Sequence, residues 1–155
     1  MGLGSNLGDR RRRIEAAVER LGAEGVKVRA VSSLYRTAPV GPVAQPWFVN
    51  AAVAVEARRT PSEMLALIKK VEAELGRRRR ARYGPREVDI EILLAGRTIL
   101  RSPGLVLPHP RMSGRRFVLV PLAEIAPRAV HPRARKTVRT LLRETGDHSP
   151  VIRLK

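Results

Sequence analysis

The sequence contains no cysteine, which excludes disulfide scaffolds, cysteine-ligated zinc sites and catalysis by a thiol. It also has no long hydrophobic run. The first residues, MGLGSNLGDRRRR, lack an apolar stretch of the length found in signal peptides. The longest uncharged segment, 37–55, contains three prolines, which a lipid-facing span would not carry. We therefore expect a cytoplasmic protein that does not contact a membrane.

Aromatic side chains are also scarce, since only five of the 155 residues are Phe, Trp or Tyr. The net charge, by contrast, is +17, from 31 Lys and Arg against 14 Asp and Glu. Such a charge favours nucleic acid, because cations neutralise phosphates and release counterions. However, no pair of aromatics lies at strand spacing in a basic segment, which makes a poor stacking platform for single-stranded RNA or DNA. We expect no nucleic-acid partner, with a basic RNA-binding α+β module as the competing interpretation.

The positive charge is concentrated in one segment. Residues 77–86 read RRRRARYGPR and hold six arginines without an acidic residue. A local concentration of charge suits one highly charged small ligand as well as it suits a polymer. The rest of the arginine excess has no functional interpretation at this level.

Composition and hydrophobic spacing predict one α+β domain over residues 1–155. With 43% hydrophobic and 29% charged residues, the chain has a globular composition and enough length for a real core. Apolar residues at helical spacing predict helices after Asp9 and Thr60, and a short one around 137–143. Several connections are too short for crossover helices, which favours a mostly antiparallel sheet packed by helices. Strands are expected at 26–37, 48–57 and 88–92.

Two carboxylates share one face of the strand expected at 88–92. Alternate side chains of a strand point the same way, so Asp89 and Glu91 lie together, opposite the apolar face. Their Cα atoms should be ~6.7 Å apart, and like charges at this spacing require a cation between them. Either arginines from 77–86 supply it in a salt-bridged network, or a hard divalent ion such as Mg²⁺ does. The neighbouring arginines favour Mg²⁺, because phosphoryl-transfer sites combine carboxylates for metal with guanidinium groups for phosphate.

Three other features carry weaker signals. Glu72 lies at the edge of the buried face of the second helix, where an ion pair with an arginine would explain it. His109 stands between two prolines, and a lone loop histidine is more often a surface residue than a catalyst. The start GLGSNLG lacks the spacing of a P-loop or a dinucleotide-binding loop, and a tight strand-to-helix turn explains its glycines better.

Six segments, taken in order, resemble one protein family over nearly the whole chain. They are GLGSNLGD at 2–9, SSLYRTAPVGP at 32–42, QPWFVNAAV at 45–53, GRRRRARYGPREVDIEILL at 76–94, LPHPRM at 107–112 and RRFVLVPLAEIAP at 115–127. Together they resemble the 6-hydroxymethyl-7,8-dihydropterin pyrophosphokinases of folate biosynthesis. The resemblance implies a ferredoxin-like α+β fold. It also implies that ATP gives its β,γ-pyrophosphoryl group to the hydroxymethyl oxygen of a reduced pterin, leaving AMP, and we expect a monomer with these two small-molecule substrates.

The resemblance also implies which residues bind ATP. Asp89 and Glu91 match the positions that hold two Mg²⁺ ions bridging the triphosphate, and they are implied to be catalytic. Arg79 and Arg86 are implied to be catalytic as well, within a basic loop that covers ATP. The further positions that match nucleotide-binding residues are Glu72, Arg77, Arg82, His109 and Arg115.

The pterin pocket follows from the same resemblance. Three of the five aromatic side chains match positions around one flat heterocycle, where stacking contributes both affinity and orientation. The residues that match pterin-binding positions are Thr37, Pro39, Val40, Phe48, Asn50, Tyr83 and Phe117.

Two site residues depart from the family pattern. The usual metal pair is Asp-x-Asp, whereas this chain has Glu91 at the second position, with a longer and less constrained side chain. Tyr83 stands where tryptophan is common, a change that keeps an aromatic face. A catalytically inactive homologue is therefore a further competing interpretation.

Overall fold

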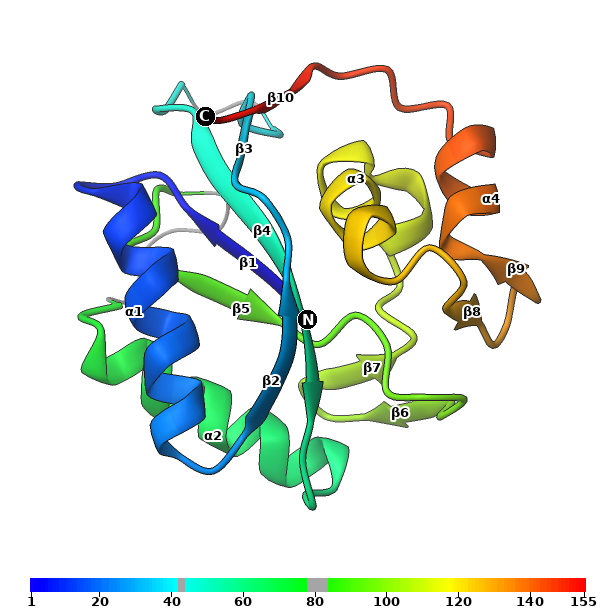
Figure 1. The fold of residues 1–155 in the computed structure, drawn as a ribbon, viewed down its shortest axis with the longest axis horizontal. Helices are drawn as coiled ribbons and strands as arrows, with labels where there is room; N and C mark the ends of the chain where they lie inside the picture. The colour runs from blue at the N-terminus through cyan, green and yellow to red at the C-terminus, as the bar shows by residue number, and fades with distance from the viewer. Residues whose placement is uncertain (42–43, 78–83) are drawn as a thin grey trace.

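A computed structural model describes residues 1–41, 44–77 and 84–155 of the chain. Figure 1 shows a central sheet with helices on both sides. The helices are α1 (Arg10–Ala23), α2 (Pro61–Glu74), α3 (Arg116–Ile125) and α4 (Val138–Glu144), with a 3-10 turn at Met112–Gly114. The strands are β1 (Gly2–Ser5), β2 (Lys27–Val31), β3 (Tyr35–Thr37), β4 (Phe48–Glu56), β5 (Asp89–Glu91), β6 (Leu100–Ser102), β7 (Leu105–Leu107), β8 (Val130–His131), β9 (Lys136–Thr137) and β10 (Val151–Arg153).

Six of the strands form one antiparallel sheet. The order is β10-β3-β4-β1-β5, and β2 pairs with the far end of β4, beyond the part of β4 that pairs with β3. The hairpins β6-β7 and β8-β9 are separate two-stranded sheets. The expected mostly antiparallel sheet packed by helices is therefore confirmed.

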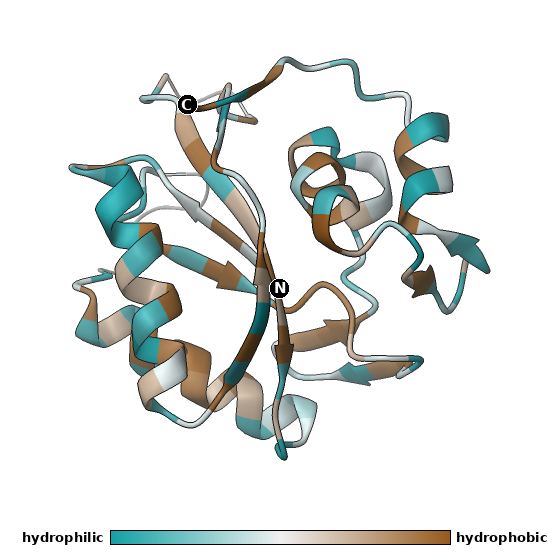
Figure 2. Cartoon of the chain, in the orientation of Figure 1, coloured by the Kyte–Doolittle hydropathy of each residue, from teal (hydrophilic) through white to brown (hydrophobic). Residues whose placement is uncertain are grey.

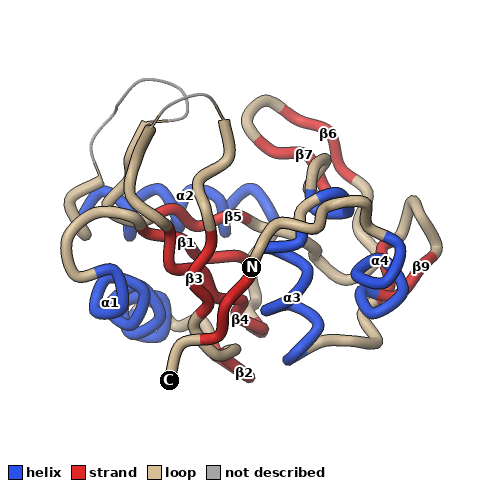
Figure 3. Tube along the Cα trace, turned by 90° about the horizontal axis from the view of Figure 1, so that it is seen from above, coloured by secondary structure: helices blue, strands red, loops and turns tan. Residues whose placement is uncertain are grey.

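Each face of the sheet has its own hydrophobic core. Helices α1 and α2 cover one face, where Ile14, Leu21 and Ile68 are almost completely buried. Helices α3 and α4 lie on the other side (Figure 3), and Leu119 belongs to a second cluster there with Ala52 of β4. Figure 2 colours much of β4 brown, as expected for a strand enclosed between two helical layers.

Helix α1 begins as the sequence predicts, with Asp9 as N-cap accepting a hydrogen bond from the backbone N–H of Arg12. Its first turn nevertheless carries four arginines and no acidic residue, which opposes the helix dipole. Three of them donate to distant backbone carbonyls: Arg10 to Trp47 at 2.7 Å, Arg11 to Lys155 at 2.9 Å and Arg13 to Leu75 at 2.9 Å. These contacts offset the unfavourable position of the charges by tying the helix start to three other segments.

Helix α2 has the predicted capping box. The Thr60 hydroxyl accepts a hydrogen bond from the backbone N–H of Glu63, and the Glu63 carboxylate accepts one from the backbone N–H of Thr60. Pro61 occupies the first helical position, where no N–H is needed. The chain leaves the helix through Gly76 at φ +83°, a conformation that favours glycine.

Thr60→Ala should lower the free energy of unfolding by about 1 kcal/mol, because it leaves an N-terminal N–H of α2 without its cap. The matched control is Thr98→Ala, which changes an exposed threonine outside the helices and strands. Urea unfolding of both variants measures the difference. Equal stability of the two variants would show that the capping box contributes nothing.

Several elements were not predicted. The segment after Arg115 is a helix, α3, although it contains Pro121, and the short strands β6 to β10 carry too little periodicity to be recognised. The strand expected at 88–92 is shorter, spanning Asp89–Glu91, and β1 lies within the glycine-rich start itself. In the described parts of the chain, every helix is too short or too polar to cross a membrane.

Candidate active site

A cavity of about 130 Å³ opens between the central sheet and the start of α3. Its walls come from β1, β3, β4, β5 and α3, together with the segments before β4 and β5. The lining residues are Gly2, Leu3, Gly4, Thr37, Ala38, Val40, Gln45, Phe48, Asn50, Ala51, Gly84, Arg86, Asp89, Glu91, Arg111, Arg115, Phe117 and Val118. Residues from positions 2 to 118 thus meet at one place.

The strand register explains why polar side chains gather on this face. Gly4 of β1 lies opposite Asn50 of β4 on one side and opposite Asp89 of β5 on the other. Cross-strand partners share a face, so an amide and a carboxylate flank a glycine that has no side chain to cover them. A Cβ at Gly4 would lie 2.7 Å from the Asn50 Oδ1 atom, which is closer than any carbon–oxygen contact permits. Glycine at this position therefore makes room for the amide.

The cavity lining combines aromatic rings with a buried amide. The rings are those of Phe48 and Phe117, and Val40 adds an apolar side chain. Asn50 donates from Nδ2 to the Thr37 hydroxyl at 2.6 Å, and both side chains are buried. This bond fixes the orientation of the amide, so the wall presents apolar surface beside oriented polar atoms, as in sites for flat heterocycles.

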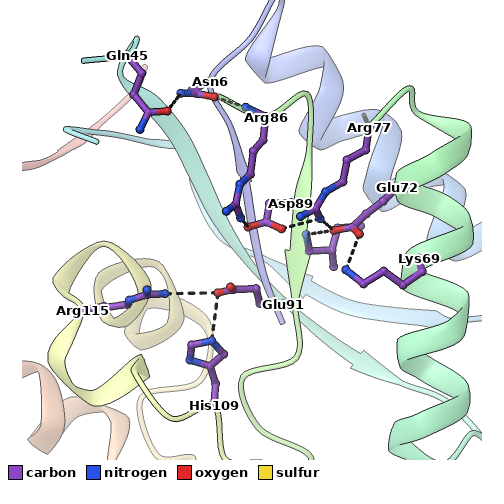
Figure 4. Close-up of polar contacts among 11 residues, drawn as sticks. Asn6, Gln45, Lys69, Glu72, Arg77, Arg86, Asp89, Glu91, His109 and Arg115 are labelled. Atoms are coloured by element: carbon purple, nitrogen blue, oxygen red, sulfur yellow. Dashed lines mark hydrogen bonds and ion pairs between the residues drawn. The ribbon is translucent and has the colours of Figure 1, made fainter. Parts of the chain in front are cut away.

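Glu91 lies among cationic side chains (Figure 4). Its Oε2 atom is 3.5 Å from His109 Nε2 and 3.7 Å from Arg115 Nη1. The hydrogen bond from His109 lowers the pKa of Glu91, and the positive charges of Arg115 and Arg111 lower it further, against the opposing effect of burial. Glu91 is therefore held in its ionised form.

Asp89 is held by two arginines that flank the segment 78–83. Its Oδ1 atom is 2.6 Å from Arg77 Nη1, and its Oδ2 atom is 2.5 Å from Arg86 Nη1. Figure 4 shows the Asp89 carboxylate between the guanidinium groups of Arg77 and Arg86. Two arginines of 77–86 thus pair with this carboxylate, and the choice between a salt-bridged network and Mg²⁺ stays a prediction.

Glu72 is buried behind this pair, with only 2% of its surface exposed. It forms an ion pair with Arg77, accepts a hydrogen bond from Lys69 Nζ at 2.8 Å, and accepts another from the backbone N–H of Ile90 at 2.8 Å. The predicted ion pair with an arginine is confirmed. The third contact was not foreseen: through it, the helix α2 fixes the strand that carries Asp89 and Glu91.

The donor set of the cavity fits magnesium. Asp89 and Glu91 are the carboxylates that line it, and Mg²⁺ is commonly held by one or two carboxylates together with water and substrate phosphates. Within residues 1–41, 44–77 and 84–155, no group of three or more acidic or histidine side chains forms a complete metal site. Water and phosphate oxygens would supply the remaining ligands.

The residues expected from the resemblance fall into three groups. The cavity brings together Thr37, Val40, Phe48, Asn50, Arg86, Asp89, Glu91, Arg115 and Phe117. Another group, outside the lining, consists of Pro39, Glu72, Arg77 and His109, of which the last three contact Asp89 or Glu91 or each other. Arg79, Arg82 and Tyr83 lie outside the described residues.

Two polar lining residues were missed. Gln45 and Arg111 both lie within segments that carry the family resemblance, QPWFVNAAV and LPHPRM. Both are polar residues in otherwise apolar or proline-rich segments, and this was the sequence feature that could have identified them as site residues. Nothing in the spacing alone indicated that they would line the cavity.

Comparisons with known proteins agree with this geometry. The sequence model described as 7,8-dihydro-6-hydroxymethylpterin-pyrophosphokinase matches residues 1–127. The 2-amino-4-hydroxy-6-hydroxymethyldihydropteridine pyrophosphokinase of Methylorubrum extorquens is 48% identical over 128 residues, which cover 82% of this chain and 81% of that one. The enzyme of the same name from Bacillus subtilis is 48% identical over 124 residues, covering 79% and 74%.

A solved structure has the same fold. The Plasmodium falciparum HPPK-DHPS triple mutant with pteroate superposes with a TM-score of 0.72 at 17% identity. The match covers 92% of this chain, which spans 42% of the length of that longer chain. At this identity the likeness concerns the fold alone, and it agrees with the expected ferredoxin-like α+β architecture.

Proposed function

Because this chain belongs to the 7,8-dihydro-6-hydroxymethylpterin-pyrophosphokinase family, it is an ATP-dependent diphosphokinase, and we propose that the cavity between the sheet and α3 is its active site. It transfers pyrophosphate from ATP to 6-hydroxymethyl-7,8-dihydropterin, giving AMP and the pterin diphosphate, in folate biosynthesis. One observation carries the assignment of the site. Two carboxylates, several guanidinium groups and two aromatic rings line the same cavity.

In this proposal the pterin binds beside the aromatic rings. Phe48 and Phe117 stack against the ring, and the amide of Asn50, oriented by Thr37, hydrogen-bonds to its edge. The heterocycle has several donors and acceptors on one edge, so an amide held in a fixed orientation contributes specificity. Pro39, Val40 and Tyr83 complete the proposed pterin site.

In this proposal the triphosphate binds next to the arginines of the cavity. Arg86 and Arg115 line the cavity, and each pairs with a carboxylate. Each guanidinium group can bind phosphate oxygens together with that carboxylate or in place of it. A guanidinium fork matches two phosphate oxygens at once, which suits arginine better than lysine to this task. The other residues of the proposed nucleotide site are Glu72, Arg77, Arg79, Arg82 and His109.

Asp89 and Glu91 hold two Mg²⁺ ions in this proposal. Bound there, the metal would neutralise the triphosphate and polarise the phosphoryl oxygens. The support is the pairing of both carboxylates with cations in the structure, which shows that this face of β5 accommodates positive charge. The longer side chain of Glu91 still reaches His109 and Arg115, so its carboxylate lies within the same site.

Catalysis then consists of positioning and charge stabilisation. The hydroxymethyl oxygen attacks the β-phosphorus and forms a bond to it, the proton of the hydroxyl passes to water, and the bond from the β-phosphorus to the AMP oxygen breaks, so that AMP leaves. Arg86 and Arg115 stabilise the negative charge on the transferring group, since they are already fixed by their carboxylate partners. Phe48 and Phe117 hold the pterin so that its hydroxyl is in line.

The protein acts as a cytoplasmic monomer with one domain over 1–155 in this proposal. The single domain is supported by Val138 and Leu141 of α4, which lie beyond the matched region but pack into the second core with α3.

The competing RNA-binding role has less support, because three arginines of α1 donate hydrogen bonds to backbone carbonyls.

With Mg²⁺, ATP and 6-hydroxymethyl-7,8-dihydropterin, the purified protein should release AMP in an amount equal to the pterin diphosphate formed. EDTA in excess of Mg²⁺ should stop the reaction, and a mixture without the pterin should release no AMP. Ion-exchange chromatography measures the AMP released and the pterin diphosphate formed in each mixture. Release of ADP, or no turnover by folded protein, would contradict the proposed function.

A further inference from the structure

Asn6 connects the two halves of the proposed active site without lining the cavity itself. It follows β1 and is only 2% exposed. Its Nδ2 atom donates to Gln45 Oε1 at 2.9 Å and to the Pro46 carbonyl at 3.2 Å. Its Oδ1 atom accepts from the backbone N–H of Arg86 at 2.7 Å (Figure 4).

The backbone of Asn6 strengthens one of these links. Its N–H donates to the Arg86 carbonyl at 3.1 Å, so Asn6 and Arg86 are joined by two hydrogen bonds. The amide therefore uses both of its donors on one segment and its acceptor on the other. A planar group bonded on both sides fixes the separation of the two segments that it joins.

Each of these segments carries one half of the site. Gln45 lines the cavity, and Pro46 leads directly into β4 with Phe48 and Asn50, the proposed pterin contacts. Arg86 reaches Asp89, the proposed metal ligand. The two halves lie 40 residues apart in sequence, and Asn6 bonds to both.

We propose that Asn6 is a positioning residue that sets the distance between the pterin hydroxyl and the phosphate chain. This inference rests on the proposed function. Because Asn6 touches neither substrate site directly, its loss should leave each substrate's own affinity nearly unchanged. It should instead lower kcat, since the in-line geometry of the transfer depends on the relative placement of the two halves, where an error of about 1 Å can cost 10²-fold.

The experiment compares kcat with the separate dissociation constants of Asn6→Ala. Binding of the pterin alone and of a non-hydrolysable ATP analogue with Mg²⁺ is measured by calorimetry, and turnover by AMP release. We expect kcat to fall by at least about tenfold while both dissociation constants stay within about threefold. Asn6→Asp is the second variant, because it retains the acceptor for the Arg86 N–H and loses the amide donor to Gln45 and Pro46.

Ser5→Ala is the matched control. Ser5 is equally buried and donates to the Glu87 carbonyl at 2.6 Å, but this bond reaches only the phosphate side. We expect it to lower the melting temperature while kcat stays within about threefold, since it makes no bridge. A general loss of packing would instead lower kcat in the Ser5 and Asn6 variants alike.

Three outcomes would overturn the inference. They are an unchanged kcat in a folded Asn6 variant, a loss of substrate affinity large enough to account for the whole defect, and failure of both Asn6 variants to fold, which would make Asn6 a purely structural residue. Failure of the proposed function is recognised separately, because the unmodified protein would then release no AMP in the same assay.

Discussion

Asp89→Asn should lower turnover on the order of a thousandfold while the fold is retained. The change removes the negative charge that we propose binds Mg²⁺, and losses of one electrostatic contact to a transition state reach about 10²- to 10³-fold. It also removes the carboxylate that Arg77 and Arg86 share, so Arg86 loses this ion pair while Arg77 keeps its ion pair with Glu72. The measurement is the rate of AMP release at saturating substrates.

Asp9→Asn is the matched control for this change. It is chemically identical and also replaces one of the chain's three aspartates, but Asn caps a helix as well as Asp does. We expect wild-type turnover from it and a closely similar melting temperature. A rate for Asp89→Asn within a few-fold of wild type would remove Asp89 from the metal site.

Gly4→Ala should weaken pterin binding by about tenfold or more and lower the free energy of unfolding by about 1–3 kcal/mol. The new Cβ would lie 2.7 Å from Asn50 Oδ1, so the amide has to move. Asn50 is short, buried and bonded to Thr37, and it has no flexible end that could yield cheaply. Titration of the pterin and urea unfolding measure the two effects.

Gly22→Ala is the same substitution at another position, and we expect it to change the stability in the opposite direction. Gly22 is exposed near the end of α1, its φ is not positive, and nothing lies within 4 Å of the added Cβ. Alanine should therefore raise the stability by up to about 1 kcal/mol and leave pterin binding unchanged. If Gly4→Ala bound the pterin as tightly as Gly22→Ala, the close contact with Asn50 would have no role in recognition.

Local patterns predicted the parts of the fold that depend on neighbouring residues. The caps at Asp9 and Thr60 follow from residue types within one helical turn, and both were found. The placement of Asp89 and Glu91 on one face follows from the two-residue period of a strand. These features need no knowledge of distant segments.

Local patterns could not predict the features that depend on contacts between distant segments. The partners of Glu91 come from the loop at His109 and from the start of α3, and no spacing links them to β5. The helix α3 was not predicted because it contains Pro121, and proline inside an apolar run argues against a helix. The aromatic residues of the proposed pterin site were suggested only by the family resemblance, because Phe48 and Phe117 are 69 positions apart.

The position of β1 between β4 and β5 has a consequence for the order in which the protein can be made. β1 is the first strand synthesised, but both of its neighbours come later, at Phe48–Glu56 and Asp89–Glu91. On the ribosome, the pairing of β1 with β4 has to wait until Glu56 has emerged, and the other edge of β1 stays unpaired until Glu91 has emerged. Such long-range pairing slows folding and leaves strand edges exposed in the meantime. The cavity, whose walls extend to Val118, is completed later still, so the nascent chain acquires its capacity for catalysis only after the first residues of α3 have emerged.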